Sequence, residues 1–316
     1  MGIIETLSAG FDTVRRKPWL VLVPALLDLG FWIAPKLSIL SLVQGSLREL
    51  LAAAATNPEL APNLQEVGQA LEQMAQSVNL LTLLSSSFLG VPSLSIADTT
   101  SFFGRAHLVL EVPGGATLIA LVLGLSLLGV LIGAIYLGLI AQQVRDGRTD
   151  WARLLRRLPQ YWLRLLGAGL LILVVLTCLG LPITLLLGVF GVLSPSLASF
   201  MTVLVSAAVL WLLFYLAFVP EAILFGEDSI LRAIWHSLSV VRSNFWSALG
   251  LFVLVNVITA GLMFIWDWLT ASSAGALLAI VANAYIGTGL AAALFIFYRE
   301  RYRAWQAASG QLRSRV

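Results

Sequence analysis

The feature that most constrains this chain is the long apolar run between Trp246 and Trp268. Its only charged residue is Asp267, near its far end. A helix needs about 20 consecutive apolar residues to cross the hydrocarbon core of a bilayer. Tryptophan is enriched where the membrane meets water, because its ring is apolar and its N–H is polar. The run therefore predicts a membrane-spanning helix that opens at an interfacial tryptophan.

Five further apolar runs are long enough to be spans, so six transmembrane helices are expected. The chain is 59% hydrophobic and 11% charged, whereas about a quarter of the residues in a soluble domain are charged. The runs are continuous rather than alternating, which argues against a membrane β-barrel. The predicted class is all-α integral membrane, with the other spans at Trp19–Val43, Thr117–Gln142, Tyr161–Val189, Leu197–Val219 and Gly275–Tyr298.

Short amphipathic segments precede three of these runs. In Ile230–Arg242 the apolar side chains recur with helical spacing, and Asp228 is placed to cap the first turn. Residues 3–16 show the same pattern, as do residues 151–158, which Pro159 is expected to end. A short helix with an apolar face and a basic face suits the plane of the membrane interface. The alternative is a cytoplasmic helix packed on the protein's own ends.

The three segments join their spans through similar sequences, which suggests an internal repeat. Each has the basic end of an amphipathic helix, a short turn and an aromatic start to the span, at Val14–Trp19, Arg157–Trp162 and Val241–Trp246. Each span then returns through a second one. The chain is therefore predicted to form three hairpins in the same orientation, each preceded by an interfacial amphipathic helix. The alternative is that any interfacial helix before a tryptophan-led span has this appearance.

One polar stretch interrupts the single polytopic membrane domain predicted for residues 1–316. Residues 44–115 are rich in polar side chains and contain more acidic than basic residues. They are too many for a structureless loop in a compact domain. Asn63–Leu84 has the spacing of an amphipathic helix, and Leu80–Leu94 could be re-entrant or lie on a surface. We expect a non-cytoplasmic excursion inserted between the first and second spans.

The distribution of basic residues predicts the orientation. With six spans, both termini lie on one side of the membrane, and sixteen of the 19 Lys and Arg residues fall on that side. Only Lys36, Arg48 and Arg105 fall on the other. Because loops rich in Lys and Arg stay in the cytoplasm, we expect a multi-pass protein of the cell (inner) membrane with both termini cytoplasmic.

Polar residues inside the predicted spans are the first candidates for a functional site. Asp28 lies roughly nine residues after Trp19, which is about 13 Å along a helix. Asn256 lies at a similar depth after Trp246, and the two would approach each other if the hairpins are related by pseudosymmetry. The functional interpretation is a proton or cation site, and the structural one is a hydrogen-bonded clamp between helices. Asn283 is interpreted as a helix-packing residue.

Motifs for catalysis, metals and nucleotides are missing from the sequence. His107 and His236 are its only histidines, and neither zinc-type nor phosphate-loop spacing occurs. The chain is therefore expected not to be an enzyme and to hold no cofactor or metal. Glu221, Glu227 and Asp228 are interpreted as cap and interface residues rather than as a carboxylate cluster.

Two basic clusters are candidates for contact with anionic lipid headgroups. The alternative is that their charge only sets the orientation of the chain. The expected partners are membrane lipids and, as a further possibility, other membrane proteins, with no nucleic acid. The candidate contacts are Arg15, Arg16, Lys17, Arg153, Arg156 and Arg157.

Three stretches carry a resemblance to a known group, namely Phe218–Ile223, Ala233–Ser237 and Val241–Trp246. They resemble the prokaryotic six-span proteins related to the membrane domain of glycerophosphodiester phosphodiesterases. In that group a proline near the end of the fourth span precedes an amphipathic helix and a basic-aromatic entry to the fifth. The resemblance covers residues 1–43 and 116–305 and implies the fold and a membrane location. No phosphodiesterase domain is attached, so no enzymatic activity is implied.

Two functions remain as alternatives. The first is a non-catalytic membrane protein that acts as an accessory, scaffold or lipid-interacting component of a membrane complex. The second is a small-solute or ion transporter that uses an intramembrane site at Asp28.

Overall fold

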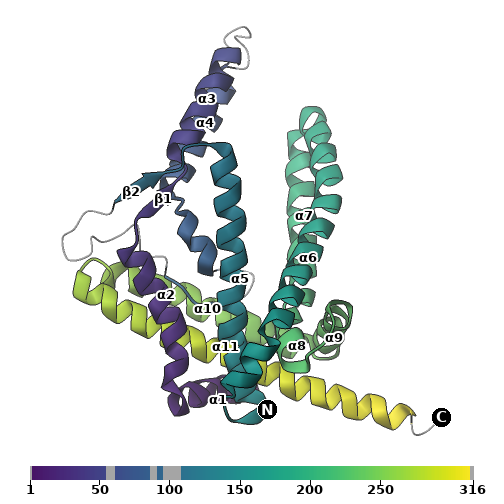
Figure 1. The fold of residues 1–316 in the computed structure, drawn as a ribbon. Helices are drawn as coiled ribbons and strands as arrows, with labels where there is room; N and C mark the ends of the chain where they lie inside the picture. Colours follow the sequence, from purple (N-terminus) through teal and green to yellow (C-terminus); the bar gives the residue numbers. More distant parts are fainter. Residues whose placement is uncertain (1, 55–60, 86–90, 95–107, 314–316) are drawn as a thin grey trace. The chain divides into compact units, whose positions relative to one another are not determined.

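The computed structural model describes residues 2–54, 61–85, 91–94 and 108–313, and they are almost entirely helical (Figure 1). Five helical segments are long and apolar enough to cross a membrane: α5, α6, α7 together with α8, α10 and α11. The predicted helical class is confirmed, although one pair of three-residue strands is also present. The elements are α1 (Ile3–Arg16), η1 (Pro18–Val21), α2 (Leu22–Ile33), β1 (Lys36–Ser38), α3 (Leu40–Ala54), α4 (Ala61–Ser77), η2 (Leu80–Ser85), β2 (Val109–Glu111), α5 (Gly115–Asp146), α6 (Trp151–Leu193), α7 (Pro195–Leu216), α8 (Val219–Gly226), α9 (Ile230–Ser243), α10 (Phe245–Leu269) and α11 (Ser273–Arg313).

The chain divides into two compact units, and each is described by itself. Unit 1 contains residues 1–17, 134–257 and 289–316, and therefore α1 and α6 to α9. In it, α6 pairs with α7, and α8 packs on α9. Helix α1 lies against α11, where Gly10 faces the backbone of Gly289 and the ring of Phe11 covers Gly289. A side chain at either glycine would collide with the facing helix, so the glycines permit this close approach.

The helix predicted at Ile230–Arg242 is observed as α9 (Ile230–Ser243), and its position at the membrane interface stays a prediction. Its buried residues include the small side chains Ala233 and Ser237. Ser237 accepts a hydrogen bond from the Phe218 N–H at 3.2 Å and donates one to the Tyr215 carbonyl at 2.7 Å. These two backbone groups lie where α7 gives way to α8. Ser237 therefore satisfies two backbone groups that the helix break would otherwise leave unpaired.

The third predicted amphipathic helix does not end at Pro159. Instead, α6 runs without a break through Pro159 and Pro182, so the short turn expected before Tyr161 was wrong. Proline lacks an N–H and its ring crowds the carbonyl of the preceding turn, so each of these residues costs α6 one hydrogen bond and some strain. In an apolar environment every further broken backbone bond would be costly, and prolines are tolerated within spanning helices.

Unit 2 contains residues 18–133 and 258–288. The predicted first span, Trp19–Val43, is not a single helix there. Helix α2 stops at Ile33, and Ala34 is extended with ψ 153°, because the residue before Pro35 is sterically excluded from the helical region. The chain then forms β1, which pairs in parallel with β2. Residues 18–33 form a shorter apolar stretch than the five long ones.

The remainder of unit 2 has a small apolar core and a helical hairpin. Trp32 packs on Ala276 and Ile280. Helices α3 and α4 lie side by side (Figure 1). The helix expected over Asn63–Leu84 ends at Ser77, and its apolar residues Val67, Leu71 and Met74 are exposed. Within residues 67–77 of α4, the buried positions are the small residues Gly68 and Ala75, and Gly68 lies against Leu47 of α3.

Candidate functional site

The sharp turn between α5 and α6 positions the first part of the site. Helix α5 ends at Asp146, and Gly147 follows at φ +66°, a left-handed conformation that glycine adopts without steric cost. Gln142 ties the two helices together, because its amide donates to the Asp150 carbonyl at 3.2 Å and accepts from the Asp150 N–H at 3.1 Å. Asp150 caps α6 by accepting from the Arg153 N–H at 2.9 Å.

Glu227, which follows α8, supplies the second part. It sits in the left-handed region at φ 56°, which costs a residue with a side chain about 1–2 kcal/mol. Arg164 donates to the Glu227 carbonyl at 2.7 Å, and Arg145 donates to the Phe225 carbonyl at 3.4 Å. Both guanidinium groups therefore lie at the C-terminal end of α8, where the helix dipole favours positive charge.

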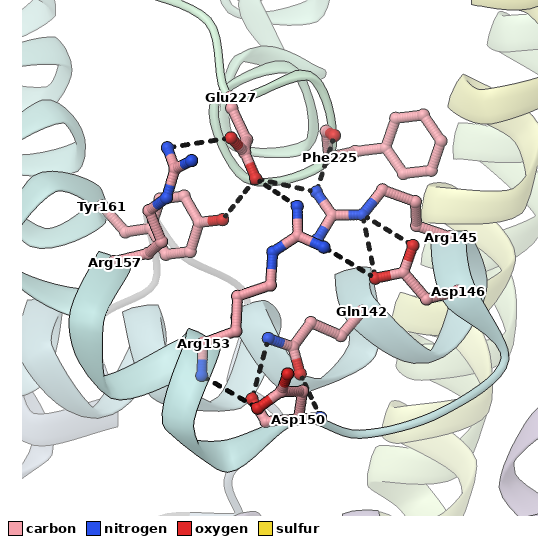
Figure 2. A network of polar contacts seen from close by, with 9 residues as sticks. All are labelled: Gln142, Arg145, Asp146, Asp150, Arg153, Arg157, Tyr161, Phe225 and Glu227. Carbon is pink, nitrogen blue, oxygen red and sulfur yellow. Dashed lines mark hydrogen bonds and ion pairs between the residues drawn. The ribbon is translucent and has the colours of Figure 1, made fainter.

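Three arginines converge on the Glu227 carboxylate (Figure 2). Arg145 and Arg153 reach Oε1 at 3.2 and 3.1 Å, and Arg157 reaches Oε2 at 2.9 Å. The Tyr161 hydroxyl lies 3.4 Å from Oε1. The network thus joins the end of α5, the start of α6 and the end of α8 through one carboxylate.

The charges around Glu227 explain its ionisation. Burial alone would raise the pKa of its carboxyl, but the positive charges of Arg157 and Arg145 and the hydrogen bond from Arg153 lower that pKa below its ordinary value. Asp146 balances part of the arginine charge, since it lies 3.2 Å from Arg145 and 3.5 Å from Arg153. Glu227 therefore remains a carboxylate at neutral pH.

An open cavity of about 340 Å³ adjoins this network. Its lining consists of Asp150 and three arginines, Arg153, Arg156 and Arg157. These are the three α6 residues that the sequence suggested as contacts for anionic lipids, and the structure brings them together on one surface. A cavity with three guanidinium groups and one carboxylate is suited to an anion, because each guanidinium offers several N–H donors in a planar fork.

The other predicted basic contacts lie at the end of α1. Arg15 and Arg16 are exposed and Lys17 is half-buried. Arg15 pairs with Asp12 on its own helix at 3.3 Å. An exposed pair of this kind contributes little to stability, so the Arg15 side chain can exchange Asp12 for a lipid headgroup at little cost.

The predicted intramembrane residues have separate surroundings. Asp28 is fully buried and accepts from the Ser93 hydroxyl at 2.5 Å and from the Leu94 N–H at 3.0 and 3.1 Å. Asn256 donates to the Phe252 carbonyl one turn earlier on α10. Asn283 has a buried amide nitrogen without a hydrogen-bond partner. Asp28 and Asn256 belong to different units, so their approach stays a prediction.

Of the three acidic residues interpreted as cap and interface residues, Glu227 is the C-cap of α8 and Glu221 lies in its first turn, but the cap role expected for Asp228 was wrong. Asp228 does not cap α9, whose N-cap is Ser229. Instead its Oδ2 lies 2.7 Å from His236 Nδ1. Glu221 is only 7% exposed, and its Oε2 has no hydrogen-bond partner. The signal for the Glu227 site was the surplus of arginine in residues 145–164, which needs a carboxylate from elsewhere in the chain. His107 lies outside the described residues.

Within the described ranges, no three His, Cys, Asp or Glu side chains gather as a metal site would require. The long apolar helices and the arginine cluster at a polar helix end are the features of a helical membrane protein. The chain belongs to the family whose description is Domain of unknown function (DUF7847), and the family model matches residues 1–300. Neither a curated protein nor a solved structure matches the chain.

Proposed function

We propose that this chain is a non-catalytic, multi-pass protein of the cell (inner) membrane that binds anionic lipid headgroups. The site is the cavity of Arg153, Arg156 and Arg157, with both termini in the cytoplasm. In this proposal the chain crosses the membrane six times, and the short apolar stretch of residues 18–33 serves as the first span. The resemblance to the glycerophosphodiester phosphodiesterase membrane domain is part of the same proposal.

The observation that carries the proposal is the composition of the cavity. Three of its four lining residues are arginines, and arginine binds phosphate through paired N–H donors rather than as a point charge. Basic residues that face the cytoplasmic leaflet are attracted to its anionic lipids. A lipid headgroup is the anion that such a cavity would meet most often beside a membrane.

Exposed apolar side chains next to the basic surface support an interfacial position. On α6, Trp151 and Leu155 are 53% and 62% exposed, and they lie one helical turn apart. On α9, Leu231 and Trp235 are 74% and 64% exposed with the same spacing. Helices of this kind lie in the plane of the interface with the apolar side chains among the lipid tails.

Matching helix ends support the internal repeat. Lys17 and Asn244 occupy equivalent positions in the aligned segments, and each ends its amphipathic helix. The Lys17 N–H donates to the carbonyls of residues 13 and 14, and the Asn244 N–H to those of residues 240 and 241. Their φ angles are −136° and −133°. The continuous helix α6 is the copy in which this end was lost, and three hairpins remain part of the proposal.

The alternative function, transport through Asp28, has less support. Both carboxylate oxygens of Asp28 accept hydrogen bonds from the segment around Ser93 and Leu94. A carboxylate held in this way serves well as a structural clamp. It would have to give up these bonds before it could accept a proton or cation.

Native mass spectrometry of the protein released from nanodiscs tests the proposal. The nanodiscs contain phosphatidylcholine and an anionic phospholipid in equal amounts. We expect the wild type to retain the anionic lipid preferentially, and the triple variant Arg153→Gln, Arg156→Gln, Arg157→Gln to lose most of that preference. Arg48→Gln, an exposed arginine on α3, is the matched control and should behave as the wild type. Equal retention by the triple variant and the wild type would refute lipid binding at this site.

A further inference from the structure

The arginine cluster carries more positive than negative charge, and the excess indicates which kind of phosphate it would bind. Five guanidinium groups and three carboxylates meet at the network and its cavity, which leaves two positive charges. We propose that the ligand is a phosphomonoester dianion, such as the headgroup of a phosphatidic-acid-type lipid, rather than a phosphodiester. This inference rests on the proposed lipid-binding function and specifies its ligand class.

The charge of the ligand distinguishes the two classes of phosphate. A phosphomonoester carries a charge of about −1.5 to −2 at pH 7, because its second pKa lies near 6. A phosphodiester headgroup such as that of phosphatidylglycerol carries one negative charge at any pH near neutrality. Only the dianion would neutralise the excess charge of the cluster.

Hydrogen-bond donors remain available in the cluster after Glu227 has been bound. The side chain of Arg156 lines the cavity and is exposed. The three terminal oxygens of a phosphomonoester offer more acceptors than the two of a diester.

The Glu227 carboxylate acts as an internal anion that binds one side of the arginine cluster. It already engages Arg145, Arg153 and Arg157. It holds these guanidinium groups in position before a ligand arrives, which reduces the cost of ordering them on binding. The ligand then binds on the open side of the same arginines, in the cavity.

The test compares phosphatidic acid with phosphatidylglycerol of the same acyl chains, each at equal amounts in nanodiscs, by native mass spectrometry. One extra charge near basic residues is expected to favour phosphatidic acid about fivefold at pH 7.5. At pH 5 the monoester is largely singly charged, so the preference should fall towards one. Besides the arginines, the ionisable groups facing the site are Asp146, Asp150, Tyr161 and Glu227. Because the pKa of Glu227 lies below its ordinary value, this carboxylate keeps its charge at pH 5.

Variants and a soluble competitor complete the test. The triple variant Arg153→Gln, Arg156→Gln, Arg157→Gln should lose the preference for phosphatidic acid. The single variant Arg156→Gln should reduce it and, as a change at an exposed residue, should leave the fold intact. Displacement of phosphatidic acid by inorganic phosphate would show that the headgroup alone is recognised and that soluble phosphomonoesters also bind. Failure of phosphate to displace it would identify the lipid as the source.

The outcomes separate this inference from the proposed function. If the wild type retains both lipids equally at pH 7.5 and the triple variant loses both, the lipid site stands and the phosphomonoester inference is wrong. If the triple variant retains both lipids as the wild type does, both are wrong. A preference that persists unchanged at pH 5 would also overturn the inference, because the charge of the monoester could not then be its cause.

Discussion

Two buried carboxylates, Asp28 and Glu221, differ in whether their oxygens are partnered. Asp28 is fully buried, and its oxygens accept from the Ser93 hydroxyl and the Leu94 N–H. Glu221 is 7% exposed, and its Oε2 has no hydrogen-bond partner. In the sequence analysis Asp28 stood out because of its depth in an apolar run, whereas Glu221 was interpreted as a cap or interface residue.

The position of an acidic residue within an apolar run therefore does not indicate whether its carboxyl oxygens have hydrogen-bond partners in the folded protein. A carboxylate whose oxygens all accept hydrogen bonds stabilises the segments that supply the donors. A buried carboxyl group with an unpartnered oxygen costs free energy, so its replacement by an apolar side chain is expected to stabilise the protein. The two residues should therefore respond in opposite directions to substitution.

The largest expected effect is a loss of stability in Asp28→Ala. The substitution leaves the Ser93 hydroxyl and the Leu94 N–H without their acceptor, and hydrogen bonds to a charged group contribute about 1.5–3 kcal/mol each. We expect a loss of about 3 kcal/mol or more in the free energy of unfolding, measured by denaturant titration in detergent. Asp28→Asn keeps one acceptor oxygen and should lose less. Wild-type stability in Asp28→Ala would show that Asp28 is not a clamp.

The next effect has the opposite sign and concerns Glu221→Leu. Leucine has a similar volume and needs no hydrogen bond, so the variant removes the cost of an unpartnered buried polar oxygen, about 1–3 kcal/mol. The same titration should show a gain of this size. A loss instead would mean that the Glu221 carboxylate has a partner in the folded protein, and the contrast with Asp28 would fail.

A third acidic residue, Glu227, differs from both Asp28 and Glu221 because the partners of its carboxylate are positively charged arginines. Arg157 and Arg145 hold the pKa of Glu227 below its ordinary value of 4.5, although burial opposes this. A lowered pKa in the folded state means that the ionised carboxylate stabilises the fold above pH 4.5, and that this contribution is lost as the pH falls through the lowered value.

Glu227→Gln should therefore be less stable than the wild type by about 1–2 kcal/mol at pH 7. The difference should be constant above about pH 5.5 and should disappear in acid. The measurement is the difference in unfolding midpoint between the two proteins from pH 7.5 to pH 3.5. A difference that grows as the pH falls would contradict the assignment of the arginines as partners of Glu227.

The smallest effect is expected for Ser93→Ala. This change removes one of the donors to Asp28 and leaves the Leu94 N–H in place, so we expect a loss of about 1 kcal/mol. Combined with Asp28→Ala, the second substitution should add little, because the bond is already gone. Full additivity in this double-mutant cycle, measured by denaturant titration, would show that the two side chains do not interact.

Periodicity predicted the helices well where one helix could be read by itself. The helices at residues 3–16 and 230–242 and the run from Trp246 to Trp268 match α1, α9 and α10 closely. The predictions were wrong where the structure of a segment depends on the surrounding segments rather than on its own sequence. Whether Pro159 ends a helix depends on the environment of the backbone, and the pairing of β1 with β2 joins residues more than seventy positions apart.

Only the basic part of the candidate site was predicted from the sequence. The arginines of α6 were found from the sequence, because their clustering is local. Their partner Glu227 was not, because it lies more than sixty residues later in the chain and reaches them only through the packing of α8 on α6. Local charge patterns identify one side of such a site, and tertiary structure is needed for the other.

Photo-crosslinking with an anionic lipid tests the central claim most directly. A phosphatidic acid analogue with a photoreactive group near its headgroup is incorporated into nanodiscs with the wild-type protein, and the crosslinked peptides are mapped by mass spectrometry. Lipid binding at the arginine cluster predicts crosslinks concentrated in residues 142–164 and 225–231, which disappear in the triple variant Arg153→Gln, Arg156→Gln, Arg157→Gln. Crosslinks spread evenly over all the apolar helices, and unchanged in that variant, would contradict it.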